Sequence, residues 1–461
     1  MKAGVLHSYL LMLVALLTLW SQLGGPPLVA DVAVFLLVGF LSLSWGRFSV
    51  MARGLLLASI MVSLLTMWRL DSPWTVLREA ADSFAFLAAF MTSLALLRLP
   101  AYRSRLIRRC GQSLLLQPPN WRYPLLSVGS TLFGIVLNFG VLNLFVSMIE
   151  KANTLGAAQG RQWVQQARRR RMLLATLRGF TLAPLVSPMG IGVAVILANL
   201  PELKWRELFP YVLAAATVLF LVGWACDHLA GPKPVRRNAN PPRPSLLPLV
   251  RFSLLLSALM ALIFLLSWWF ELRLPQAVLV GVPLGAWLWL AWQCRLLGLM
   301  GVAPATVVLG RRLPALLGSI GNEVVALGAG AYLGYLSVAL MDPAQLAGMA
   351  GVMVDLGTWL PLVAMLVIVV LAQVGVNPII SVTFLTSMAS QVTLPGVPLP
   401  LLAAAMLAGW SLTMVTSPFT AAMMIMSRFT GLSAGRIGFH WNGVFLGTSL
   451  MTAVLLLRLA T

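Results

Sequence analysis

The sequence carries little charge for its length. Of 461 residues only 10% are charged, whereas 60% are hydrophobic, and the mean hydropathy is +0.92. Soluble globular domains carry about 25% charged residues. The longest polar stretches, 151–171 and 227–245, are each too short to bury a core of their own. The composition therefore excludes a large soluble domain and indicates a membrane protein.

Acidic residues are scarcer than basic ones, with 12 Asp and Glu against 32 Lys and Arg and a formal net charge of +20. Such an excess can indicate nucleic-acid binding, but here the basic residues are scattered over loops between apolar runs. We expect no nucleic-acid partner. Membrane topology and contact with anionic membrane lipids explain the positive charge.

Cysteine and histidine are also rare, with three residues of each. Cys110, Cys226 and Cys294 form no CxxC pair, and the histidines have no metal-ligand spacing, so we expect neither disulfides nor a metal site beyond Na⁺. HExxH and GxxxxGK[ST] motifs are absent. We expect no enzymatic activity and no cofactor, and active transport would need an ion gradient or a partner ATPase.

Apolar runs of membrane-spanning length follow one another along the chain and predict an all-α polytopic membrane protein with about 11 transmembrane helices. The first run follows Lys2 and has no clear cleavage site, so it is expected to remain as a helix. The predicted spans lie near 5–24, 28–45, 54–70, 80–98, 172–200, 207–225, 250–270, 275–293, 319–341, 400–427 and 439–459.

Basic residues give the expected orientation. With the N-terminus in the cytoplasm, 26 Lys and Arg lie in cytoplasmic loops or ends and six lie outside. The opposite orientation would invert this ratio. We expect a multi-pass protein of the inner (cytoplasmic) membrane with its C-terminus outside.

The apolar segment 123–150 does not fit a single span. Six arginines from Arg98 to Arg122 precede it and the run Arg168 to Arg171 follows it, so both flanks should be cytoplasmic. A segment that begins and ends on one side indicates a re-entrant hairpin, here with Asn138 and Gly140 at its midpoint. Irregular backbone at membrane depth is tolerated where it lines a cavity, so these residues are candidates for a transport site.

A second long apolar segment, 358–391, has Asn377 and Pro378 near its middle and no Lys or Arg in its flanks. It predicts a second hairpin, which enters from outside. Each hairpin is followed by an apolar segment that a Ser-Pro pair interrupts, at 172–200 and 400–427. The candidate residues at these two helix breaks are Ser187, Pro188, Gly190, Thr416, Ser417 and Pro418.

One hairpin from each side predicts two repeats of inverted topology. The expected units are a leading helix at 1–27, a first repeat at 28–225, a basic cytoplasmic linker at 226–249 and a second repeat at 250–461. A helix broken at mid-membrane exposes N–H groups for an anion and carbonyl groups for a cation. For any single Ser-Pro pair, a simple helix kink is the plainer interpretation, and a lone asparagine is more often an interhelical hydrogen-bonding residue.

In this order of elements the chain resembles the ion transporter superfamily, most nearly the divalent anion:sodium symporters. The resemblance implies that the two hairpin tips and the two helix breaks meet near the bilayer midplane and bind an anionic solute and Na⁺. It also implies a scaffold that forms a homodimer. The symporters carry Ser-Asn-Thr at each tip, whereas this chain has Leu137-Asn138-Phe139 and Val376-Asn377-Pro378. Without these hydroxyls a dicarboxylate is a poorer candidate for the solute.

Glu323 is the acidic residue expected inside a spanning helix. An intramembrane carboxylate indicates a proton carrier, a cation ligand or the partner of an arginine such as Arg178, although a position near the helix end would allow contact with the interface. The sequence thus predicts a secondary transporter of a small anionic solute, a carboxylate or oxyanion, coupled to Na⁺ or H⁺. A transporter of lipid-like substrates or a scramblase is the alternative, and an intramembrane enzyme is a weaker one.

Overall fold

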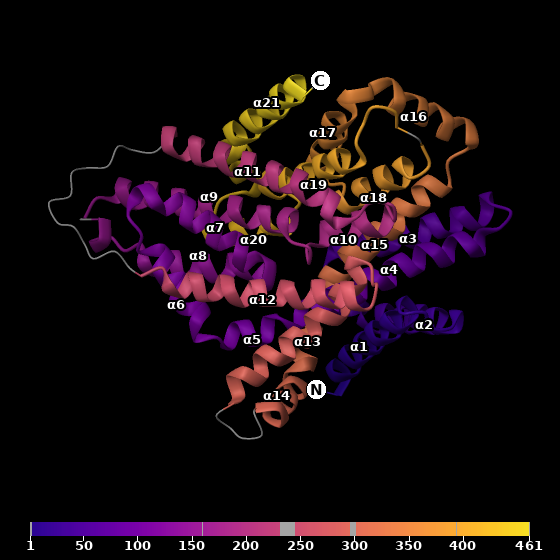
Figure 1. Cartoon of the computed structure of the whole chain (residues 1–461), viewed down its shortest axis with the longest axis horizontal. Helices are drawn as coiled ribbons and strands as arrows, with labels where there is room; N and C mark the ends of the chain where they lie inside the picture. The colour runs from indigo at the N-terminus through magenta and orange to yellow at the C-terminus, as the bar shows by residue number, and fades with distance from the viewer. Residues whose placement is uncertain (1, 159, 231–244, 296–300, 393, 461) are drawn as a thin grey trace.

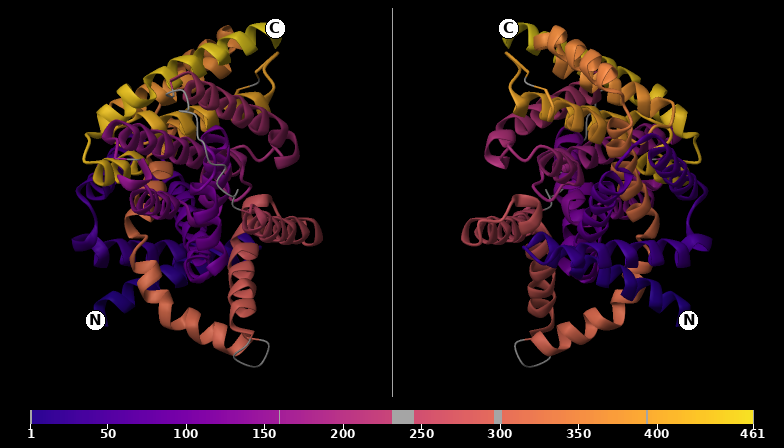
Figure 2. Two further views of the ribbon diagram at one scale, coloured as in Figure 1. Left: turned by 90° about the vertical axis from the view of Figure 1, so that its left-hand side faces the viewer. Right: turned by 90° about the vertical axis from the view of Figure 1, so that its right-hand side faces the viewer.

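The computed structural model describes residues 2–158, 160–230, 245–295, 301–392 and 394–460. Within these ranges the chain forms helices joined by turns and loops, and no strand. The N-terminus lies at the bottom and the C-terminus at the top of the views in Figure 1 and Figure 2. In Figure 1, helices α7, α8 and α9 lie between the long helices α11 and α12.

The first part of the chain forms eleven helices up to residue 230, in the order α1 Lys2–Gln22, α2 Pro27–Ser44, α3 Val50–Arg69, α4 Pro73–Leu96, α5 Arg98–Arg103, α6 Arg105–Leu115, α7 Pro119–Leu137, α8 Gly140–Ala152, α9 Gln162–Val186, α10 Ile191–Asn199 and α11 Trp205–Ala230. The second part forms α12 Leu247–Trp269, α13 Leu274–Cys294, α14 Val302–Gly318, α15 Gly321–Ala339, α16 Pro343–Leu356, α17 Leu360–Gln373, α18 Pro378–Ala389, α19 Leu399–Thr416, α20 Ala421–Thr430 and α21 Asn442–Ala460. A π-helical turn, Arg436–Trp441, precedes α21.

Ten described helical segments are long and apolar enough to cross a membrane, or up to 11 if the bent pair α14–α15 counts as one span. The prediction of an all-α polytopic membrane protein is therefore confirmed. Helix α12 illustrates why such a fold needs lipid, because only 17% of its most apolar window is buried within the protein. Trp268 and Trp269 at its end are both exposed.

Four helices were not predicted: α5, α6, α14 and α16. Helix α6 shows the reason, because Ile107, Cys110 and Leu114 are buried at helical spacing while Arg105 and Arg108 are exposed. An amphipathic helix of this kind has too low a mean hydropathy to be recognised as a span. Helix α16 continues through a short 3₁₀ turn into α17, so that 343–373 is itself of spanning length.

Helical hairpins occur where the two hairpins were predicted. Helices α7 and α8 meet at Asn138 and Phe139, and α17 and α18 meet between Val374 and Asn377. The two predicted helix breaks are also present, one between α9 and α10 and one between α19 and α20. The division into inverted repeats stays a prediction. Of the predicted linker 226–249, residues 231–244 lie outside the described part, while α11 extends to Ala230.

Each hairpin packs closely on one of the broken helices. Gly179 of α9 faces α7 so closely that a Cβ on it would overlap the main chain of Ser127. Gly409 of α19 faces α17 in the same way, since a Cβ on it would lie 2.9 Å from the carbonyl oxygen of Met365. Both glycines lie eight residues before the serine at the helix break. Small residues let membrane helices approach this closely.

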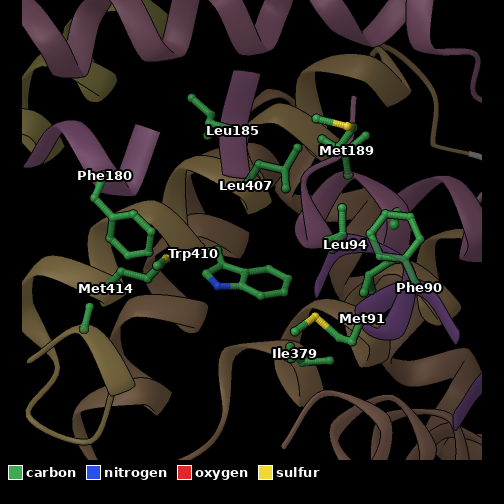
Figure 3. Packing of buried hydrophobic residues seen from close by; sticks show 14 of the residues in the cluster. Phe90, Met91, Leu94, Phe180, Leu185, Met189, Ile379, Leu407, Trp410 and Met414 are labelled. Atoms are coloured by element: carbon green, nitrogen blue, oxygen red, sulfur yellow. The ribbon is translucent and has the colours of Figure 1, made fainter. Parts of the chain in front are cut away.

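The centre of the molecule is filled by apolar side chains from both parts of the chain. Figure 3 shows the indole of Trp410 with Phe180 and Met414 on one side and Met91 and Ile379 on the other. These side chains come from α19, α9, α4 and α18. The packing therefore holds the two broken helices and the second hairpin against α4.

Candidate functional site

Predicted site residues line two cavities, and the larger of these has a volume of about 220 Å³. Its wall includes the tip of the α17–α18 hairpin, with Asn377 and Pro378, and the break after α19, with Ser417. Phe139 from the tip of the α7–α8 hairpin also lines it, and so does Glu323 of α15. The cavity thus brings together elements that are far apart in the sequence, and most of its lining side chains are apolar.

The tip of the second hairpin is fixed by Asn377, which caps α18. Its Oδ1 accepts a hydrogen bond from the backbone N–H of Ile379 at 3.1 Å. Its Nδ2 donates to the carbonyl oxygen of Ala326 at 2.9 Å. One side chain therefore starts the helix and holds the hairpin tip against α15.

The break after α19 is held by the two residues that end this helix. Ser417 Oγ donates to the carbonyl oxygen of Ala372 in α17 at 2.6 Å. The Oγ1 of Thr416 accepts from Gln373 Nε2 at 3.1 Å. Gln373 Oε1 is buried and has no hydrogen-bond partner within the described residues. The ends of α17 and α19 thus present oxygen atoms close to one another.

The smaller cavity, of about 30 Å³, has room for about one water molecule. It is lined by Asn138 from the tip of the first hairpin and by Ser187 and Gly190 from the break between α9 and α10. Ser187 Oγ accepts from the backbone N–H of Met189 at 3.1 Å, which stabilises the local turn. The break therefore lies against the hairpin tip in this part of the molecule too.

Asn138 has an unusual backbone conformation, with φ of 51° and ψ of −133°. Together with Phe139, at φ of −56° and ψ of −19°, it forms a type II′ turn. Asn138 is the first central residue of this turn, a position where glycine is the usual residue. Asn138 Nδ2 is buried and has no partner among the described atoms. A strained residue with an unsatisfied amide at a hairpin tip is a functional candidate.

An ion pair lies between the two cavities. Arg98 Nη2, at the start of α5, lies 2.6 Å from Glu323 Oε2, in the first turn of α15. Their side chains are 11% and 25% exposed. Arg98 lines the smaller cavity and Glu323 lines the larger one. The pair therefore connects the site of the first hairpin with that of the second.

The expected pairing of Glu323 with Arg178 is wrong. Arg178 is buried among α9, α11 and the start of α21, where it donates to Asn442 Oδ1 at 3.0 Å and to the carbonyl oxygen of Gly223 at 3.2 Å. Its guanidinium also lies over the ring of Phe445. These contacts show that Arg178 joins helices, whereas the partner of Glu323 is Arg98.

Four of the predicted residues line neither cavity: Gly140, Pro188, Thr416 and Pro418. Gly140 starts α8, and a Cβ on it would displace the hydroxyl of Tyr102. Pro188 and Pro418 lie in the two helix breaks, where they cannot continue the preceding helix. These residues shape the backbone of the site.

Three residues of the two cavities, Arg98, Phe139 and Trp410, were not predicted as site residues. Arg98 was counted with the cytoplasmic flank of the first hairpin, because a positive charge between two apolar runs indicates a loop. Trp410 lies in the apolar part of its segment, before the Ser-Pro pair, and carries no local signal. For Phe139, its place beside Asn138 in a hairpin tip was a usable signal.

No group of three or more His, Cys, Asp and Glu side chains suited to a metal ion occurs in the ranges that the structure describes. Cys110 lies in α6, outside the candidate spans, and burial raises the pKa of its thiol to about 11. It therefore stays protonated at neutral pH and is a poor nucleophile or metal ligand.

Comparison with solved structures finds the fold in a known transporter. The YdaH transporter of Alcanivorax borkumensis, whose crystal structure was described as having an unusual topology, matches with a TM-score of 0.53 and 13% sequence identity. The match covers 88% of this chain and 98% of that chain. No protein-family model and no curated protein sequence matches the chain. At this identity the match establishes the fold and not the solute.

Proposed function

We propose that the chain is a secondary transporter that moves a small organic anion by alternating access through the larger cavity. The observation that carries this proposal is the position of that cavity, between a hairpin tip and a helix break and beside the tip of the other hairpin. Discontinuous helices of this kind form the substrate sites of many secondary transporters. The likeness to a solved transporter fold supports the same conclusion.

The helix ends at the cavity support the proposal of an anionic solute. Helices α18 and α20 begin at Pro378 and Ala421, which both line it. The N-terminal end of a helix carries a partial positive charge, so two such ends favour a carboxylate or an oxyanion. At α18 this is the effect of the helix dipole, because Pro378 has no N–H and the N–H of Ile379 donates to Asn377. The guanidinium of Arg98 lies close by, paired with Glu323.

The size and lining of the cavity refine the solute further. An apolar protein cavity of about 150 Å³ holds benzene, so about 220 Å³ is enough for a single ring with an acidic group. Phe139, Trp410 and Met414 would contact the ring. We therefore propose an anion with an apolar body in preference to a fully hydrated ion such as sulfate.

Coupling to Na⁺ or H⁺ is part of the proposal. Oxygen atoms gather where α17 and α19 end, at Gln373 and Thr416, and the C-terminal end of a helix favours a cation. Glu323 is the candidate for carrying a proton. The proposal also includes an inner-membrane location, a cytoplasmic N-terminus, a homodimer and no enzymatic activity.

A second candidate, a transporter of lipid-like substrates, is favoured by the mostly apolar lining of the larger cavity. A lipid-like solute would need apolar length more than a charged group. The two candidates therefore differ in their response to a small charged ring and to its neutral analogue.

A melting-temperature screen of the purified protein tests the proposal, because a ligand that binds the folded state stabilises it. The panel contains benzoate, benzenesulfonate, the neutral analogue methyl phenyl sulfone, sulfate and a lysophospholipid, each with and without Na⁺. We expect benzoate and benzenesulfonate to raise the melting temperature and the sulfone and sulfate to leave it unchanged. A shift with the lysophospholipid alone would support the second candidate, and no shift with either aromatic anion would contradict the proposal.

A further inference from the structure

The Arg98–Glu323 pair lies at the position where an anionic solute would need a positive charge. Arg98 shares the smaller cavity with Asn138 and Ser187, and Glu323 shares the larger cavity with Asn377. The contact between Nη2 and Oε2, at 2.6 Å, joins the two cavities. The pair thus lies between both hairpin tips.

We propose that Arg98 is the anion-binding group of the transport site and that Glu323 occupies it as an internal substitute when no solute is bound. The acidic group of the solute displaces Glu323 from Arg98, and the freed carboxylate takes up one proton. This inference rests on the proposed function, which it extends by naming the binding residue and H⁺ as the coupling ion.

The charge balance explains why displacement and protonation go together. In the solute-free state one cation, Arg98, neutralises one anion, Glu323. If a second anion enters, one cation cannot neutralise both, and an unpaired carboxylate in poorly hydrated surroundings is costly. A proton taken from water removes that charge and forms the O–H bond of the Glu323 acid. The bound state then contains Arg98 with the solute anion and a neutral Glu323, so no net charge is added.

The geometry leaves room for the exchange. Glu323 is held through Nη2 alone in the structure, whereas a guanidinium has five N–H donors. An entering sulfonate or carboxylate can therefore contact Arg98 before Glu323 has left. The carboxyl group of Glu323, on the wall of the larger cavity, has space to turn away from Arg98.

Few other titratable groups lie near the pair. Tyr102 of α5 is the neighbour that interacts electrostatically with both Arg98 and Glu323. His7 of α1 and Arg47 line a separate small cavity beside Asn322, the residue before Glu323. Among the described residues that line the larger cavity, Glu323 is the one titratable side chain. His7 is therefore the group that a control must separate from Glu323.

The test measures benzenesulfonate binding to the purified full chain by calorimetry at pH 6, 7 and 8 without Na⁺. Benzenesulfonate stays ionised throughout this range, so any proton taken up belongs to the protein. With one proton bound per anion, the affinity should rise about tenfold for each unit by which the pH falls. Titrations in two buffers of different ionisation enthalpy should give one proton taken up per anion. This measurement on the unmodified protein needs no variant.

Variants then test whether Glu323 takes up the proton and whether Arg98 binds the anion. Glu323→Gln resembles the protonated state, so it should bind benzenesulfonate at pH 8 at least as tightly as the native protein does at pH 6, with no pH dependence. Arg98→Gln should lose binding, and Arg98→Lys should retain part of it. His7→Gln should keep the native pH dependence. Methyl phenyl sulfone should bind to none of them.

Binding of benzenesulfonate that is independent of pH, with no proton uptake, would overturn this inference and leave the proposed transporter standing. Loss of binding in folded Glu323→Gln would also overturn it, because the pair would then be a structural contact. If the native protein bound no benzenesulfonate at any of the three pH values, both this inference and the anion-transport proposal would be contradicted.

Discussion

Ser411 Oγ donates a hydrogen bond of 2.7 Å to the carbonyl oxygen of Thr181, and the two residues have the same register in the two broken helices. Each lies six residues before the serine at its own helix break, Ser187 or Ser417. Helices α9 and α19 therefore cross at equivalent positions. Such a contact is expected where two repeats are related by a pseudo-two-fold axis, so it supports the predicted inverted repeats.

Removing this contact should weaken the crossing of the broken helices. We expect Ser411→Ala to lower the free energy of unfolding by about 0.6 kcal/mol, the average measured for interhelical hydrogen bonds in a membrane protein, and by no more than about 1.7 kcal/mol, the largest value measured. Thr413→Val is the matched control, because the Thr413 hydroxyl bonds within α19, to the carbonyl oxygen of Trp410. Chemical denaturation of both variants in detergent measures the difference. Equal losses of unfolding free energy in the two variants would show that the Ser411–Thr181 hydrogen bond does not stabilise the helix crossing.

The backbone of Asn138 predicts opposite effects of two substitutions on stability. Glycine adopts a φ of 51° readily, so Asn138→Gly should keep or raise the melting temperature. Asn138→Ala retains the strain and should be less stable than the glycine variant by about 1 kcal/mol. Both variants lose the amide, so we expect both to lose transport. A fully active Asn138→Gly would remove Asn138 from the proposed site.

Asn377 should matter for both stability and transport. Asn377→Ala removes the cap of α18 and the bond to Ala326, which should cost about 1 to 2 kcal/mol, and it should abolish benzenesulfonate binding. The control is Asn153→Ala, since Asn153 Nδ2 also donates to a main-chain oxygen, that of Gln165, and neither residue lines the two cavities. Melting curves with and without the anion compare the two. A destabilised Asn153→Ala that still responds to the anion is expected, and an unchanged response in Asn377→Ala would contradict the role of the tip.

The close contact of α7 and α9 predicts that a side chain at Gly179 strongly destabilises the protein. Gly179→Ala forces its Cβ against the main chain of Ser127, which cannot give way as a flexible side chain would, so we expect failure to fold or a large fall in melting temperature. Gly447→Ala in α21 meets nothing within 4 Å and should be neutral or slightly stabilising. Size-exclusion profiles and melting temperatures of the Gly179→Ala and Gly447→Ala proteins measure this difference. Similar behaviour of the two would mean that the helices are packed less closely than described.

The hairpin tips and helix breaks of the site could be predicted from the sequence, because the residues that indicate them lie at these positions. Asn138 in its turn, Asn377 before a proline and the two Ser-Pro pairs each disturb an apolar run, and hydropathy shows where they interrupt it. The positions of the two hairpin tips and the two helix breaks follow from these residues.

The charged pair of the site could not be predicted in the same way. Arg98 and Glu323 are 225 residues apart, and nothing near either residue indicates the other. Basic residues beside a span normally indicate a loop, so Arg98 was assigned to the cytoplasmic flank of the hairpin. Only the packing of α4, which ends just before Arg98, against α15 brings the two side chains together.

Uptake of radiolabelled benzenesulfonate into proteoliposomes tests the central claim most directly, since this permanently charged anion does not cross a bilayer unaided. The native protein should accumulate it when an inward pH or Na⁺ gradient is imposed, whereas Asn377→Ala and protein-free liposomes should not. If the native protein took up no more than protein-free liposomes under both gradients, the larger cavity would not be a transport site for such an anion, and the account would be contradicted.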